Sequence, residues 1–119
     1  MRPTFSRAAF ALVTFIAFAA LACGSGSTAS DRPMNIPFDA PFVDQKNLRF
    51  DPSSLAVKAG ETVYFKNSET ALHTVTIDGK NESGNMKRDD VFAWIASTPG
   101  VFHITCEYHP QMRSTITVQ

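Results

Sequence analysis

Apolar and polar residues alternate in short runs along residues 48–118, and this pattern constrains the fold more than any other feature of the chain. A period of two is typical of β-strands with one buried face. Turn-forming pairs such as Asp78-Gly79 separate the runs, and no segment carries the apolar stripe of an amphipathic helix. The spacing therefore predicts an all-β sandwich or barrel, with a longer surface loop over the polar residues 78–90. The alternating positions are Leu48, Phe50, Leu55, Val57, Val63, Phe65, His73, Val75, Ile77, Phe92, Trp94, Phe102, Ile104, Cys106, Ile116 and Val118.

The first 22 residues differ in composition from the rest of the 119-residue chain. They contain Arg2 and Arg7, no acidic residue, and then a run without charge over residues 8–22. That run is too short to span a bilayer comfortably, and it is typical of the apolar part of an export signal. We therefore predict a signal peptide at 1–22, a flexible tether at 23–35 and a single folded domain at 36–119.

The charge balance excludes one class of function. The chain has 11 basic and 11 acidic residues, and removing the two arginines of the predicted signal leaves 9 basic against 11 acidic residues. A mildly acidic domain gives no electrostatic support for binding nucleic acid. With only two cysteines, one of which lies beside the leader, the chain is also not a disulfide-stapled scaffold.

Small residues precede Cys23 and a Gly/Ser stretch follows it. This arrangement resembles the lipobox of bacterial lipoproteins, in which the cysteine becomes the acylated N-terminus. The resemblance implies lipidation of Cys23 and a membrane anchor at that residue. The alternative is an ordinary secretory signal that happens to end near a cysteine. Both interpretations place the domain outside the cytoplasm, in the periplasm or at the cell surface.

Residues 106–112, with the sequence CEYHPQM, place three metal-binding side chains on one loop. The loop connects a strand predicted to end near Cys106 with one predicted to start near Ser114. A thiolate, an imidazole and the thioether of Met112 together suit copper far better than magnesium or calcium, and a type 1 copper site needs two His, one Cys and a weak axial Met. A single buried His, Cys or Met is usually a core residue, but the convergence of all three on one loop favours a metal site.

The fourth donor must be one of the two other histidines in the sequence. His73 has the same parity as Val75 and Ile77, which places it on the core side of its predicted strand. His103 has the opposite parity to Ile104, so a regular strand would point it to solvent. Parity therefore selects His73 as the distant ligand.

From about residue 46 to the end, the chain resembles the cupredoxin family, in particular its small plastocyanin- and amicyanin-like members. Any one of the matching segments is weak evidence, but together they follow the family's order and spacing. The resemblance implies a Greek-key β-sandwich of the cupredoxin type. The segments are Phe50-Asp51-Pro52, VKAGETV at 57–63, Phe65-Lys66-Asn67, His73-Thr74-Val75, PGVF at 99–102, CEYHPQM at 106–112 and STITV at 114–118.

Carried onto this sequence, the resemblance implies one type 1 copper ion held by four residues and an electron port at the ligand His109. It also implies a docking surface around that histidine, for which Pro110, Gln111 and Met86 are candidates. The implied copper ligands are His73, Cys106, His109 and Met112.

We therefore expect a monomeric one-electron carrier between extracytoplasmic redox partners, and not an enzyme. The alternative is a copper-binding protein for delivery or resistance, but such proteins are often rich in Met and His, and residues 23–119 contain only three of each. A copper oxidase or reductase needs further copper centres with many more histidine ligands, and the one spare histidine, His103, cannot build one.

Overall fold

The computed structural model describes residues 35–119, which fold into β-strands without a helix in that range. Two predicted segments lie outside the described residues. One is the signal peptide at 1–22, and the other is the tether at 23–35, which includes Cys23 and of which only residue 35 is described. Among residues 35–119 there is accordingly no helix of the length and apolarity that a membrane span requires. The strands are β1 (Phe42–Lys46), β2 (Arg49–Asp51), β3 (Ser54–Val57), β4 (Thr62–Asn67), β5 (Thr76–Ile77), β6 (Lys80–Asn81), β7 (Val91–Ile95), β8 (Gly100–Thr105) and β9 (Arg113–Val118).

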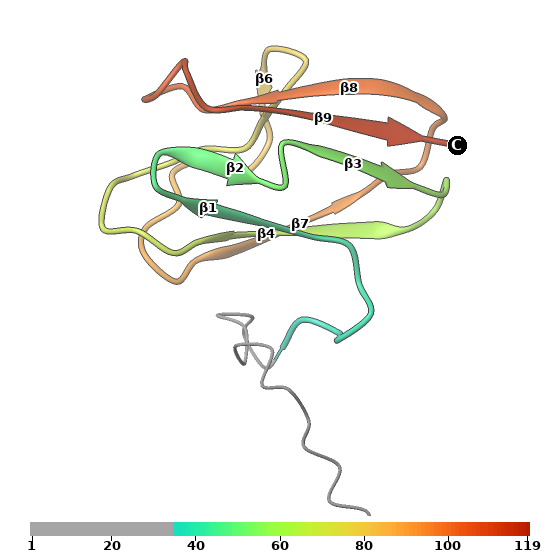
Figure 1. Cartoon of the computed structure of the whole chain (residues 1–119), viewed down its shortest axis with the longest axis horizontal. Coiled ribbons are helices and arrows are strands. Elements are labelled where there is room, and N and C mark those ends of the chain that lie inside the picture. Colours follow the sequence, from blue (N-terminus) through green and yellow to red (C-terminus); the bar gives the residue numbers. More distant parts are fainter. Residues whose placement is uncertain (1–34) are drawn as a thin grey trace, which may run out of the picture.

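Two mixed sheets form the sandwich. One has the strand order β2-β1-β4-β7 and the other has the order β3-β9-β8-β5-β6. Strands β1 and β4 pair in parallel, as do β3 and β9, while the remaining neighbours are antiparallel. In Figure 1 the orange and red strands β8 and β9 lie across the domain from β1, β4 and β7. The predicted all-β sandwich is therefore confirmed.

The core lies between the sheets and follows the predicted alternation for most strands. On β4 the side chains of Val63 and Phe65 are fully buried, and on β8 and β9 so are those of Ile104 and Ile116. Burying aliphatic and aromatic side chains of this size contributes roughly 1.5–3 kcal/mol each. The alternation of apolar residues thus decides which face of each sheet turns inward.

The prediction was wrong at Leu48, which is 39% exposed. Asn47 and Leu48 form the turn between β1 and β2, and both have a φ of 53°. Two successive residues with positive φ are typical of a tight hairpin turn whose twist matches the strands. A leucine in this conformation is uncommon. An apolar residue at this position therefore suggested a buried strand position, although Leu48 belongs to the turn.

The predicted strand from His73 to Ile77 is shorter than expected. Only Thr76–Ile77 belong to β5, and His73 makes an isolated bridge with Met86. All residues from 73 to 77 are buried, because neighbouring segments cover both faces.

The polar segment 78–90 contains the short strand β6 and otherwise forms a loop, as predicted.

Candidate metal centre

The loop between β8 and β9 carries Cys106, His109 and Met112, between a strand that ends at Thr105 and one that begins at Arg113. These boundaries agree with the predicted strand ends. The backbone N–H of Met112 donates to the carbonyl of His109 at 2.9 Å, which closes a tight turn. Both ends of the loop are thus fixed by a pair of antiparallel strands.

His73 comes from a different part of the chain, the connection between β4 and β5. Its backbone exchanges two hydrogen bonds with Met86, at 3.1 and 2.8 Å. The side chain is fully buried. This bridge fixes the direction in which the imidazole enters the end of the sandwich.

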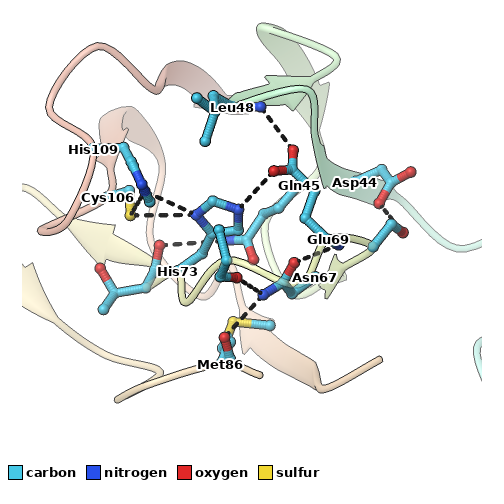
Figure 2. Close-up of polar contacts among 12 residues, drawn as sticks. Asp44, Gln45, Leu48, Asn67, Glu69, His73, Met86, Cys106 and His109 are labelled. Carbon is cyan, nitrogen blue, oxygen red and sulfur yellow. Dashed lines mark hydrogen bonds and ion pairs between the residues drawn. The ribbon is translucent and has the colours of Figure 1, made fainter. Parts of the chain in front are cut away.

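Figure 2 shows three candidate ligand atoms that face one another, on His73, Cys106 and His109. Nδ1 of His73 lies 3.2 Å from Nδ1 of His109, and Sγ of Cys106 lies 3.8 and 3.7 Å from these two nitrogens. By geometry, a point in the plane of this triangle is about 2.1 Å from each atom, which is close to usual metal–nitrogen and metal–thiolate bond lengths of about 2.0–2.3 Å. Two imidazoles and a thiolate are also the donor set that copper prefers. The described residues therefore fit a trigonally bound copper ion.

Met112 is fully buried in the core cluster, three residues after His109. Cys106 is likewise buried and is a free thiol. His109 is only half-buried. Of the two histidines in the triangle, His109 is thus the one that reaches solvent.

Burial is the main influence on the pKa of His73 and lowers it below its ordinary value. The carboxylate of Glu69 raises this pKa, and a positive charge on His109 lowers it again. The net direction is downward, which favours the neutral imidazole at neutral pH. Metal binding requires this neutral form.

The remaining predicted residues have mixed outcomes. His103 is exposed, as its parity predicted, and lies outside the convergent group. Pro110 and Gln111 are exposed near His109. Met86 is 3% exposed and belongs to the core, so its predicted place on a docking surface was wrong. Its backbone forms the bridge with His73, and its side chain packs in the core.

Sequence reasoning missed the polar residues that surround the ligands. The hydroxyl of Thr74 accepts the backbone N–H of Glu107 at 3.0 Å, which joins the residues that follow His73 and Cys106. The carboxylate of Glu69 lies 3.5 Å from Nε2 of His73. No periodicity marks these residues as part of a site, because Thr74 occupies an ordinary polar position of an alternating segment and Glu69 lies in an irregular loop.

Comparison with known proteins gives a consistent result. A family model described as a cupredoxin-like domain matches residues 12–118. Amicyanin from Paracoccus versutus is 30% identical over 94% of this chain and 92% of its own length. Plastocyanin from Ulva pertusa is 33% identical over 64% of this chain and 92% of its own length.

The fold is also similar to solved structures. The crystal structure of amicyanin from Paracoccus versutus superimposes with a TM-score of 0.66 at 28% identity. The match covers 71% of this chain and 86% of the amicyanin chain. The similarity therefore extends over nearly the whole folded domain of that protein.

Proposed function

This chain belongs to the cupredoxin-like domain family, and on that basis we propose that it is a type 1 copper protein that carries single electrons between redox proteins outside the cytoplasm. The observation that carries the proposal is the convergence of two imidazole nitrogens and one thiolate sulfur within 4.8 Å of one another. The similarity to amicyanin and plastocyanin over most of their lengths supports it.

We propose that Nδ1 of His73, Sγ of Cys106, Nδ1 of His109 and the sulfur of Met112 would hold the copper ion. The support for Met112 is its complete burial and its place at the end of the hydrogen-bonded ligand loop. A weak axial thioether is typical of this class of site. When bound, copper supplies a one-electron couple between Cu(I) and Cu(II).

The chain's own contribution is to hold the donor atoms in place and to exclude water from those of His73 and Cys106. Two paired strands fix the ends of the loop that carries Cys106 and His109, and the backbone bridge to Met86 fixes His73. Burial of His73 and Cys106 excludes water from the sulfur and from one imidazole. Electron transfer is favoured when little has to move between the two oxidation states. Because His109 is half-buried, it is the proposed route by which the electron leaves the protein.

An electron carrier needs one such centre and no substrate site, which is the basis for proposing a carrier and not an enzyme. Of the three histidines in the sequence, two converge at the centre and His103 is exposed on β8. A further copper centre would need more histidines than this chain contains.

Optical spectroscopy of the copper-loaded full chain tests the proposal. We expect an intense visible thiolate-to-Cu(II) absorption band that disappears on reduction. Cys106→Ser should abolish it, and the matched control His103→Gln should keep it. A colourless protein that does not respond to reductant would exclude the type 1 site. Slow electron self-exchange together with rapid copper release would instead favour a delivery role.

The membrane anchor is a separate proposal, which is supported by the sequence around Cys23. We propose that the exported chain begins at an acylated Cys23 and that the Gly/Ser tether separates the domain from the membrane. Mass spectrometry of the N-terminal peptide from the membrane fraction tests it. A peptide without a lipid mass on Cys23 would contradict the anchor. Export is a separate question, which cell fractionation tests.

A further inference from the structure

Glu69 places a largely buried carboxylate between the β1–β2 turn and the candidate ligand His73 (Figure 2). Its Oε1 accepts the backbone N–H of Leu48 at 2.7 Å, and its Oε2 lies 3.5 Å from Nε2 of His73. Only 19% of the Glu69 side chain is exposed, and the His73 side chain is fully buried. An ionised group in such surroundings is costly unless it has partners. Here each of its two oxygens faces a different nitrogen.

The position of Glu69 is set by Asn67, whose side chain is completely buried. The side-chain Oδ1 of Asn67 accepts the backbone N–H of Glu69 at 2.8 Å. Its Nδ2 donates to the carbonyls of Ala71 and Met86, at 2.7 and 2.9 Å. Since Met86 is bridged to the backbone of His73, one connected network fixes both the carboxylate and the imidazole.

The two ring nitrogens of His73 face different environments. Nδ1 is directed at Cys106 and His109, while Nε2 is directed at Glu69. A neutral imidazole carries its proton on one nitrogen only, and the nitrogen that binds a metal must be the unprotonated one. With a metal on Nδ1, the proton therefore belongs on Nε2. Nε2 makes no hydrogen bond in this structure, and the carboxylate Oε2 of Glu69 lies 3.5 Å from it. Glu69 therefore offers an acceptor opposite this nitrogen.

A carboxylate suits this place better than any neutral side chain of the same shape. Both facing groups are N–H donors, and a carboxylate can accept on both oxygens. The amide of glutamine has one acceptor oxygen and an NH₂ donor, so it can serve only one of the two. The turn residue Leu48, held at positive φ, would compete with His73 for that single acceptor.

We infer that Glu69 is a positioning residue for His73, which holds the proton of that imidazole on Nε2 and keeps Nδ1 free for the metal. Partner groups of this kind raise the basicity of a ligand and fix its orientation. The negative charge also stabilises Cu(II) more than Cu(I), and so lowers the reduction potential. The effect on copper rests on the proposed function, whereas the proton position on His73 is a property of the metal-free chain.

Two measurements on the full chain test the inference. In the metal-free protein, long-range ¹H–¹⁵N correlations of the imidazole ring should place the His73 proton on Nε2. In the copper-loaded protein, Glu69→Gln should lower the affinity for Cu(II) by roughly 10- to 100-fold. Its affinity for Cu(I) should fall less, so the reduction potential should rise.

The matched control is Glu61→Gln. Glu61 also accepts a backbone N–H through its carboxylate, from Lys58 at 2.7 Å, but it precedes β4, at the end of that strand remote from the loop that holds Glu69. This variant should keep both the affinity and the potential of the unmodified protein.

A His73 proton found on Nδ1 in the metal-free protein would overturn the inference, and so would a Glu69→Gln variant that behaves like Glu61→Gln. If Glu69→Gln does not fold, the proton position in the unmodified chain decides alone. A copper-loaded protein without the thiolate band would contradict the proposed function, and the metal-free measurement would still decide the role of Glu69.

Discussion

The hydroxyl of Thr74 accepts a hydrogen bond from the backbone N–H of Glu107 at 3.0 Å. Thr74 follows His73 in the β4–β5 connection, and Glu107 follows Cys106 in the ligand loop. A single hydroxyl therefore ties together the two segments that supply the donor atoms. Thr74 is fully buried, and its hydroxyl also contacts that of Thr76 at 3.0 Å.

Replacing Thr74 by valine keeps the shape and removes the acceptor. We expect a loss of about 1–3 kcal/mol in the free energy of unfolding, because the Glu107 N–H is left without its partner. Urea unfolding of the metal-free protein measures this loss. Thr117→Val, at a half-buried position on β9, is the control. Equal effects of the two substitutions would contradict a specific role for the Thr74 hydroxyl.

The two sides of β8 should respond very differently to truncation. Ile104 is fully buried, whereas Val101 is 56% exposed. We expect Ile104→Ala to cost about 2–5 kcal/mol through lost burial and a residual cavity. Val101→Ala should stay within about 0.5 kcal/mol of the unmodified protein. Denaturant unfolding compares the free energies of unfolding of the two variants. A large loss for Val101→Ala would contradict the placement of its side chain in solvent.

The regular strands were predictable from the sequence because their period is strict. On β8 the alternation places Ile104 inward and His103 outward, and the same parity carries Cys106 to the buried end of the strand. This geometry brings Cys106, the first donor of the loop, to a place that His73 can reach. The short loop between β8 and β9 then leaves few alternatives for His109.

Residues outside that period could not be predicted in the same way. Gln45 on β1 is fully buried although it is polar, because β1 lies between β2 and β4 and its amide donates to the carbonyl of Thr74 at 3.2 Å. Glu69 reaches His73 through the path of an irregular loop that Asn67 shapes. Such contacts depend on the three-dimensional course of the backbone, which local sequence patterns do not encode.

Tyr108 lies in the ligand loop and donates its hydroxyl to Oδ1 of Asn85 at 2.7 Å. Because this hydrogen bond is exposed, we expect Tyr108→Phe to lower the free energy of unfolding by less than about 1 kcal/mol. The local effect should be larger, with faster amide exchange around Tyr108. Tyr64→Phe on β4 is the control and should leave exchange in the ligand loop unchanged. Unaltered exchange in Tyr108→Phe would show that the strands alone fix the loop.

Acid should destabilise the metal-free protein through His73. Burial lowers the pKa of this histidine in the folded state below the value of 6.5 that applies when it is unperturbed. The unfolded chain therefore takes up the proton at higher pH than the folded protein does, and it binds more protons in the window below about 6.5. It follows that the free energy of unfolding decreases as the pH falls through this window, down to the lowered pKa of the folded state.

Unfolding of the metal-free protein by urea, repeated between pH 5 and pH 8, measures this dependence. His73→Gln should flatten the pH dependence, because it removes the group whose pKa differs between the two states. His103→Gln, at an exposed position on β8, should retain it. If His73→Gln keeps the full slope, the acid sensitivity comes from carboxylates and not from the buried imidazole.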